Sequence, residues 1–236
     1  MITALLTAAG TGTRMGQDIP KQFLHVNNKP IIIYTMEVFE NDPNIDGIVV
    51  VTLEAWVEVV RAYAKQFNIT KLKDIVVGGN TGQESIANGI HSIVNFAGND
   101  STVLIHDGNR PLVSSEIISS AVATFNKYGS AVAAIPTVEA VFTSHDGLIS
   151  EESLPRELLY RTQTPHLYPI SEVLAAHEEA KEKGISNTAA TCVLMHELGK
   201  KVYFSKGAET NLKITTVEDL LIFKALLSTR KDDFIR

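Results

Sequence analysis

Residues Thr7–Lys21 read TAAGTGTRMGQDIPK, and an apolar run at Ile2–Leu6 leads directly into them. A glycine-rich loop lets backbone N–H groups approach an anion closely. The side chains of Arg14 and Lys21 add two positive charges beside that loop. This combination suits the triphosphate of a nucleotide, and it predicts an enzyme that transfers phosphoryl or nucleotidyl groups.

The composition of the chain limits the functions that it can have. Its 236 residues are enough for one large domain or two small ones, and the 44% of apolar residues can form a substantial core. The net charge of −6 argues against non-specific nucleic-acid binding, which needs a basic surface. The sequence shows no apolar run of membrane-spanning length and no secretory signal, so we expect no membrane association. The single cysteine, Cys192, excludes an intrachain disulfide and fits a cytoplasmic protein.

Alternating strand-like and helix-like segments predict the fold. The expected strands are Ile2–Thr7, Gly47–Val51, Lys73–Val77, Thr102–His106 and Ser130–Ile135. The expected helices lie near Ile31–Glu40, Glu54–Phe67, Gly82–Val94 and Ser115–Tyr128. Apolar strands separated by helices imply an α/β fold with a mostly parallel sheet covered on both faces. The carboxyl ends of such strands gather at one edge, where ligands bind.

The pattern changes after Pro136. Residues Thr137–Thr143, a turn at His145–Gly147 and a short strand at Leu148–Ile149 predict a β-hairpin that projects from the body. We therefore expect one domain, residues 1–236, in which residues 137–160 form an arm. The expected elements after the arm are helices at Ser171–Lys183 and Asn187–Leu198, a strand at Lys201–Phe204, and a last helix opened by a capping box at Thr216–Asp219.

The glycines of the first loop do not by themselves identify a phosphate site. The segment Gly10–Gly16 lacks the Gly-Lys-Ser/Thr ending of a P-loop, and its third glycine falls one position late for a dinucleotide-binding motif. A plain tight turn is the alternative. Arg14 together with Pro20 and Lys21 favours the phosphate interpretation.

A second glycine-rich segment, GGNTGQES at Gly78–Ser85, follows a predicted strand and opens a predicted helix. Exposed backbone donors and acceptors there could contact the edge of a base, and Ser85 would add a hydroxyl group. An ordinary strand-to-helix turn is the alternative.

The segment HDGNRP at His106–Pro111 ends a predicted strand. A carboxylate at the carboxyl end of a strand is well placed to hold Mg²⁺ against phosphates, so Asp107 is the candidate metal ligand. Arg110 could pair with Asp107 or with a phosphate. We interpret His106 as a structural, hydrogen-bonded histidine.

Two further segments carry cations that could reach the same site. Arg156 and Arg161 precede the QTP segment at Gln163–Pro165, and arginines suit bidentate phosphate binding. A surface charge is the favoured interpretation of Arg161. In the segment NLKITT, Lys213 lies between two apolar residues and could point inward. Only convergence with the other segments would make this lysine catalytic.

These segments, in this order, resemble the cytidylyltransferases that act on polyol phosphates. The family includes 2-C-methyl-D-erythritol 4-phosphate cytidylyltransferase of isoprenoid synthesis and ribitol-5-phosphate cytidylyltransferase of teichoic-acid and capsule synthesis. The matching segments are AAGTGTRMG, PKQF, GGNTGQES, HDGNRP, QTP and NLKITTVEDL, which span Ala8 to Leu220. The resemblance implies a Rossmann-like, mostly parallel sheet of the nucleotide-diphospho-sugar transferase type with a projecting β-hairpin arm.

The resemblance also implies a role for each matching position. The catalytic cations would be Arg14, Lys21 and Lys213, which neutralise the triphosphate and the charge that develops at the α-phosphorus. The nucleotide would contact Ala8, Ala9, Gly10, Gly12, Gly79, Asn80, Ser85 and Asp107, and Asp107 would also place Mg²⁺. The polyol phosphate would contact Arg110, Arg156, Thr164 and Thr188. In this family the arm packs against a second subunit, which implies a homodimer in which Arg156 could serve the neighbouring site.

The predicted reaction is direct transfer of CMP from CTP to the polyol phosphate, with release of pyrophosphate. The acceptor half of the site departs from the family pattern. Gly82 stands where an arginine is usual, Ala189 where an aspartate meets the polyol hydroxyls, and Glu139-Ala140 where Asp-Thr is frequent. The segments KPIIIYTMEVFE and EAWVEVV look closer to the ribitol-phosphate branch.

Two other function classes are weighed against this prediction. The first is a non-catalytic, nucleotide-binding relative that acts as a partner or regulatory subunit, which the altered acceptor half would fit. The second is a nicotinamide-dependent oxidoreductase. That class needs an acidic residue at the end of the second strand, where Val49–Thr52 has none.

Overall fold

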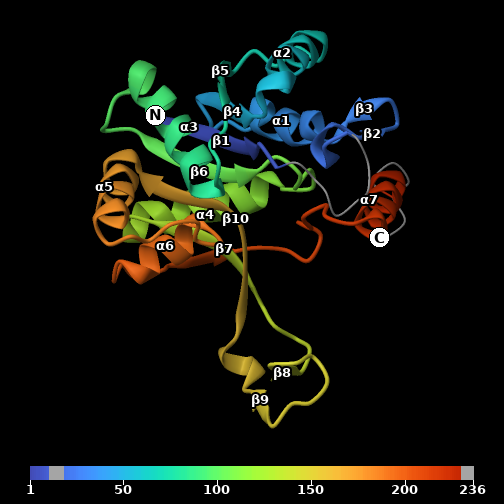
Figure 1. The fold of residues 1–236 in the computed structure, drawn as a ribbon. Helices are drawn as coiled ribbons and strands as arrows, with labels where there is room; N and C mark the ends of the chain where they lie inside the picture. The colour runs from blue at the N-terminus through green and yellow to red at the C-terminus, as the bar shows by residue number, and fades with distance from the viewer. Residues whose placement is uncertain (11–18, 230–236) are drawn as a thin grey trace.

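Figure 1 shows the computed structural model of the chain, which describes residues 1–10 and 19–229. A seven-stranded sheet runs through the centre of the molecule, with helices on both of its faces. In spatial order its strands are β11 (Phe204–Lys206), β7 (Ala131–Pro136), β10 (Tyr160–Pro169), β6 (Thr102–Asp107), β1 (Ile2–Ala8), β4 (Gly47–Thr52) and β5 (Leu72–Val77). Neighbouring strands are parallel except that β10 is antiparallel to both β6 and β7. The predicted α/β fold is therefore confirmed.

Two apolar layers bury the faces of the sheet. The helices α1 (Ile31–Asn41), α2 (Val57–Gln66) and α4 (Ser115–Tyr128) contribute to the first layer. The helices α3 (Gly82–Ala97), α5 (Ile170–Glu182) and α6 (Thr191–Glu197) contribute to the second. Because side chains alternate along a strand, β1 supplies Leu6 to the first layer and Leu5 to the second. Among the described residues, no helix combines the length and apolar character needed to cross a bilayer.

A smaller cluster lies beside the first layer. It joins the last helix, α7 (Val217–Thr229), to the short strand pair β2 (His25–Val26) and β3 (Lys29–Pro30), through the buried side chains of Phe223 and Val26. The predicted capping box opens α7. Thr216 Oγ1 accepts a hydrogen bond from the N–H of Asp219 at 3.2 Å, and the Asp219 carboxylate accepts one from the N–H of Thr216 at 2.8 Å.

The arm extends away from the body of the molecule (Figure 1). Its strands are β8 (Val141–Thr143) and β9 (Glu152–Leu154), which pair antiparallel. The prediction of a second strand at Leu148–Ile149 is wrong, because the Asp146 carboxylate accepts hydrogen bonds from both of these backbone N–H groups and holds them in the turn.

Two further predicted elements need correction, and one strand was missed. The helix expected from Asn187 begins only at Thr191, and the strand expected at Lys201–Phe204 is β11, three residues further on. Strand β10 was not predicted at all, and the QTP segment lies inside it. Polar residues and a proline in its middle hide this strand, since proline usually marks an edge strand. Its position matters because it places Thr164 beside the end of β6.

Candidate active site

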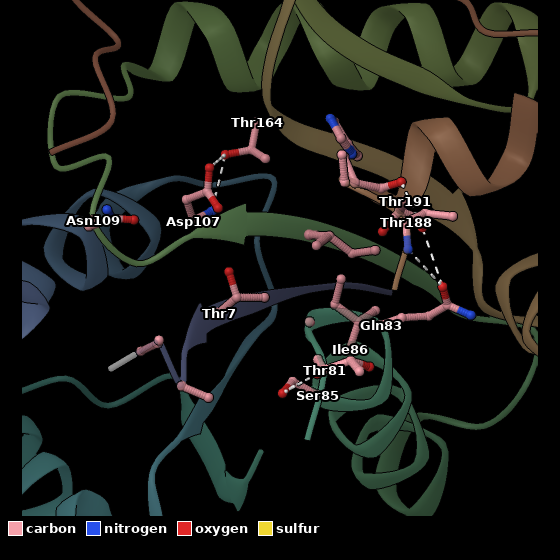
Figure 2. Close-up of a pocket in the computed structure, with 18 of the residues that line it drawn as sticks. Thr7, Thr81, Gln83, Ser85, Ile86, Asp107, Asn109, Thr164, Thr188 and Thr191 are labelled. Atoms are coloured by element: carbon pink, nitrogen blue, oxygen red, sulfur yellow. Dashed lines mark hydrogen bonds between the residues drawn. The ribbon is translucent and has the colours of Figure 1, made fainter. Parts of the chain in front are cut away.

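A cavity of about 740 Å³ lies at the carboxyl ends of β1 and β6. In Figure 2, Asp107 and Thr164 lie on one side of this cavity, while Gln83, Thr188 and Thr191 lie on the other. The predicted site residues that line it are Ala8, Ala9, Gly10, Lys21, Gly79, Asn80, Ser85, Asp107, Arg110, Thr164, Thr188 and Lys213. The fold therefore brings together segments from all parts of the chain, while the role of each residue remains a prediction.

Three predicted site residues are not placed in this cavity. Gly12 and Arg14 lie outside the described residues. Arg156 lies in the short 3₁₀ helix η4 (Arg156–Leu158), at the junction of the arm, and is not among the described residues that line the cavity. Its Nη1 instead donates a hydrogen bond to the carbonyl oxygen of Val138 at 2.8 Å.

Asp107 is the centre of a charged cluster at the end of β6. Lys213 Nζ lies 2.9 Å from one of its carboxylate oxygens, and Arg110 Nε lies 2.9 Å from the other. Burial by itself would raise the pKa of the Asp107 carboxyl, but the two cations outweigh burial and hold its pKa well below the usual range. Asp107, Arg110 and Lys213 therefore stay charged together, with one net positive charge that favours phosphate.

Thr164 is held against this cluster by two hydrogen bonds. Its Oγ1 accepts from the backbone N–H of Asp107 at 3.0 Å and lies 3.0 Å from Nδ1 of His106. Nε2 of His106 lies 3.2 Å from the carbonyl oxygen of Arg110, which can only accept, so Nε2 carries the proton and Nδ1 accepts from Thr164. Burial lowers the pKa of His106 to about 3, which keeps the imidazole neutral in this arrangement. His106 thus has a structural role, as predicted: its hydrogen bond orients the side chain of Thr164.

The second glycine loop, between β5 and α3, has no room for a side chain at Gly78 or Gly79. A Cβ atom on Gly78 would lie 2.5 Å from the Cβ of Ala9, and one on Gly79 would collide with Glu84. Ser85 Oγ donates to the carbonyl oxygen of Thr81 at 2.9 Å and accepts from the N–H of Gly79 at 3.0 Å. The Ser85 hydroxyl therefore shapes the loop, and its remaining lone pair can accept a hydrogen bond from a ligand.

Comparison with known proteins identifies the family. The family model "IspD: 2-C-methyl-D-erythritol 4-phosphate cytidylyltransferase" matches residues 2–229. The chain belongs to this family. A curated relative named ribitol-5-phosphate cytidylyltransferase, from Lacticaseibacillus paracasei, is 39% identical over 98% of this chain and all of its own length. A relative named 2-C-methyl-D-erythritol 4-phosphate cytidylyltransferase, from Geotalea uraniireducens, is 37% identical over 97% of both chains.

Solved structures agree with the fold of this cytidylyltransferase. The 4-diphosphocytidyl-2C-methyl-D-erythritol synthase of Anaerococcus prevotii superposes with a TM-score of 0.81 over 96% of both chains, at 23% identity. The 2-C-methyl-D-erythritol 4-phosphate cytidylyltransferase of Francisella tularensis superposes with a TM-score of 0.78 over 95% of this chain, at 25% identity. The protein is thus a nucleotidyltransferase that uses CTP and transfers CMP, as the sequence predicted.

Several buried amides hold the cytidylyltransferase site together, and the sequence reasoning missed them. Gln22 donates from Nε2 to the carbonyl oxygens of Ala8 at 2.6 Å and Gly10 at 3.1 Å, and so supports the start of the first loop. Asn109 donates from Nδ2 to the carbonyl oxygen of Ile214 at 2.5 Å and accepts the N–H of Ile214 on its own carbonyl oxygen at 2.9 Å. These bonds hold the segment that carries Lys213 against the end of β6.

A second pair of amides joins β10 to the same segment. Asn211 donates from its side-chain Nδ2 to the backbone carbonyl oxygen of Thr164 at 2.8 Å. The backbone carbonyl oxygen of Asn211 accepts from Arg110 Nη1 at 2.7 Å. Gln163 Oε1 accepts from the N–H of Ala208 and from Asn211 Nδ2, each at 3.2 Å. The motifs PKQF, HDGNRP, QTP and NLKITT each contain one of these amides, so the available signal was an amide side chain within each motif.

Gln83 connects two of the segments that line the cavity. Its Oε1 lies 3.3 Å from Thr188 Oγ1, and its Nε2 donates to the carbonyl oxygen of Ile185 at 3.3 Å (Figure 2 shows the contact with Thr188). The start of α3 is thereby linked to the segment between α5 and α6. Thr188 lines the cavity as predicted, but part of its hydrogen-bonding capacity is used within the chain.

Proposed function

We propose that this cytidylyltransferase transfers CMP from CTP to a polyol phosphate, with ribitol 5-phosphate as its acceptor. The observation that carries the proposal is the cavity that Asp107, Lys213 and Arg110 line together with Ala8–Gly10 and Gly79–Gly82. A relative named ribitol-5-phosphate cytidylyltransferase is 39% identical, and one named 2-C-methyl-D-erythritol 4-phosphate cytidylyltransferase is 37% identical. Both phosphates therefore belong in the test.

The residues of the cavity suit an in-line displacement. An oxygen of the acceptor phosphate attacks the α-phosphorus of CTP, a new P–O bond forms, and the bond to pyrophosphate breaks. No covalent enzyme intermediate is needed, so positioning and electrostatic stabilisation provide the rate. We assign this stabilisation to Lys21, Lys213 and Arg110. The loops at Ala8–Gly10 and Gly79–Ser85 would hold the ribose and the base.

The donor groups of the cavity fit a Mg²⁺ ion that is shared with the substrate. Asp107 is the only carboxylate among the described lining residues, and no group of three or more described His, Cys, Asp or Glu side chains could hold a metal alone. Mg²⁺ at nucleotide sites is typically bound by one or two carboxylates together with substrate phosphates. Asp107 would hold the ion, which when bound neutralises phosphate charge and polarises the phosphoryl oxygens.

We also propose that the enzyme is a homodimer formed through the arm, and that it works in the cytoplasm. The arm exposes large apolar side chains, including Phe142 at 61% and Leu158 at 74%, which a partner surface would cover. Arg156 lies at the junction of this arm and could then reach the partner's cavity.

The decisive experiment measures pyrophosphate release from CTP in the presence of Mg²⁺. The acceptors are ribitol 5-phosphate, 2-C-methyl-D-erythritol 4-phosphate and other pentitol and sugar phosphates. We expect rapid turnover with ribitol 5-phosphate and none with ATP in place of CTP. Turnover with only 2-C-methyl-D-erythritol 4-phosphate would overturn the choice of acceptor. CTP binding without turnover of any polyol phosphate would overturn the proposed function and favour the non-catalytic alternative.

A further inference from the structure

Three buried polar groups that line the cavity lack a hydrogen-bond partner among the residues that the structure describes. His166 of β10, His177 of α5 and Thr191 of α6 are 2%, 6% and 4% exposed, and all three line the cavity. Nδ1 of His166, Nε2 of His177 and Oγ1 of Thr191 have no hydrogen-bond partner among the described residues. We call these three residues the polar wall. Buried polar groups without partners are rare in folded proteins, so three of them lining one cavity indicate a ligand.

The polar wall reaches from the charged cluster, whose charges act on His166, to Thr191 on the opposite side of the cavity. His166 pairs across the sheet with Ile105, whose side chain belongs to the apolar layer under α3, α5 and α6 and also lines the cavity. Figure 2 shows Thr191 beside Thr188, away from Asp107. A ligand whose phosphate lies at Lys213 and Arg110 can therefore extend its other end toward the polar wall.

The chemistry of the polar wall selects an uncharged, hydroxyl-rich ligand. The wall contains no carboxylate, lysine or arginine. Burial lowers the pKa of His166 to about 4 and also lowers the pKa of His177, so both imidazoles are neutral near pH 7. A neutral imidazole offers one donor and one acceptor, and a hydroxyl group offers both as well. The hydroxyl groups of a polyol have the same dual capacity, whereas a phosphate or carboxylate would need cations or several donors.

We infer that the polar wall binds the hydroxyl groups of the polyol chain and thereby selects which polyol phosphate is used. This inference rests on the proposed function, because it assumes that the second substrate is a polyol phosphate. Lys213 and Arg110 bind the phosphate group, which all polyol phosphates share. The polar wall binds the polyol that is attached to this phosphate and so distinguishes one polyol from another.

The first test replaces Thr191 by valine, which removes the hydroxyl group and keeps the shape of the side chain. We expect the KM for ribitol 5-phosphate to rise roughly 10- to 100-fold, because a substrate hydroxyl loses its buried partner, and the KM for CTP to stay unchanged. His177→Leu should have the same selective effect. The matched control is Thr3→Val, because Thr3 Oγ1 is also buried without a partner but Thr3 does not line the cavity.

A second readout separates a binding role from a structural role. Since the Thr191 hydroxyl has no hydrogen-bond partner in the part of the chain that the structure describes, Thr191→Val should not lower the thermal unfolding temperature. The acceptor series should include ribitol phosphates that lack one hydroxyl group. The deoxy acceptor whose missing hydroxyl faces Thr191 should be penalised in the wild-type enzyme and hardly penalised further in Thr191→Val.

The outcomes distinguish this inference from the proposed function. If the wild-type enzyme uses no polyol phosphate, the proposed function fails and the inference fails with it. If the enzyme uses ribitol 5-phosphate but Thr191→Val and His177→Leu leave its KM unchanged, only the inference fails. A rise in the KM for CTP alone would also overturn it, because the wall would then hold the nucleotide.

Discussion

The residue that concentrates charge in this enzyme is Asp107. Its carboxylate is partly shielded from water and accepts hydrogen bonds from Lys213 and Arg110, whose cationic groups keep it ionised. Because two cations face one carboxylate, the cluster has an excess positive charge before any substrate binds. Asn109 and Asn211 hold the backbone that carries these groups, so the cluster is arranged in advance of the reaction.

Replacing Lys213 by methionine tests this arrangement. The substitution removes one cation and keeps most of the side-chain volume, so kcat should fall by about 10²–10³, as for loss of one preorganised donor. The measurement is pyrophosphate release at saturating CTP and acceptor. Lys206→Met is the control, because Lys206 is an exposed lysine paired with Glu116 outside the cavity. A kcat within about twofold of wild type would exclude a catalytic role for Lys213.

At the scale of elements, helix α3 connects the nucleotide loop to the core. The helix begins at Gly82, directly after the loop, and is capped by the Thr81 hydroxyl, which accepts from the N–H of Glu84 at 3.0 Å. Further along, Gly89 lies against β1 and β4, where an added Cβ would collide with Leu5 and lie 2.7 Å from Cγ2 of Val51. The absence of a side chain at Gly89 therefore determines how closely α3 approaches the sheet.

Gly89→Ala tests this close contact. Alanine favours a helix over glycine, but here the added methyl group overpacks the core, so we expect the free energy of unfolding to fall by about 1–3 kcal/mol. Urea titration followed by circular dichroism measures the change. Gly82→Ala is a matched control in the same helix, because a Cβ there meets nothing within 4 Å, and its stability should stay the same or rise. Equal stability of the two variants would show that the sheet can accommodate the methyl group.

At the scale of the whole molecule, the arm and the body expose different surfaces. The body buries its apolar residues in the two layers around the sheet, whereas the arm presents Phe142, Leu148 and Leu158 to solvent. Such exposed apolar side chains are expected at an interface with another chain. In the proposed homodimer, Arg156 of one subunit would contribute to the other subunit's site.

Mixing two inactive variants tests this sharing of residues. Arg156→Ala and Lys213→Met should each be nearly inactive alone. If Arg156 acts on the neighbouring site, subunit exchange forms heterodimers with one intact site, and activity should return to about a quarter of wild type, since half of the dimers are mixed. No recovery after verified exchange would overturn the proposal that Arg156 acts on the neighbouring site. A monomer in sedimentation equilibrium would contradict the dimer itself.

The buried histidines predict how the stability of the whole chain depends on pH. Burial lowers the pKa of His106 to about 3 and that of His166 to about 4, below the ordinary value of 6.5. Between these values the unfolded chain binds protons that the folded chain does not, so stability is full above about pH 6.5 and falls as the pH decreases. Each histidine should lower the free energy of unfolding by on the order of 2 kcal/mol when the pH falls from about 7 to about 5.

Urea unfolding at several pH values measures this effect. His166→Gln should remove about 2 kcal/mol of the loss of stability between about pH 7 and about pH 5. The control is His145→Gln, since His145 lies exposed in the arm and should leave the pH dependence unchanged. An unfolding free energy that is flat over this range would show that the two imidazoles are not excluded from water.

Several features of the site could be predicted because they depend on local sequence. The segments at Gly78–Ser85, His106–Pro111 and Asn211–Thr216 each combine a chain reversal with polar groups, and each lies at the cavity. The supporting residues were not predictable in the same way. Gln22 and Asn109 act through partners that are close only in the folded chain, and an uncharged amide has no local signature for such a role.

The sequence by itself determined the α/β fold, the order of its parallel strands along the chain, and the segments that meet at the site, because hydrophobic periodicity and glycine loops are local properties. Only the tertiary structure decided where β10 lies, since a polar strand is stabilised by its neighbours β6 and β7 and not by its own composition. The same holds for the pairing of Lys213 with Asp107 and for the polar wall. An ion pair, or a buried polar atom without a hydrogen-bond partner, depends on the distances between residues that are far apart in the chain. Only folding establishes those distances.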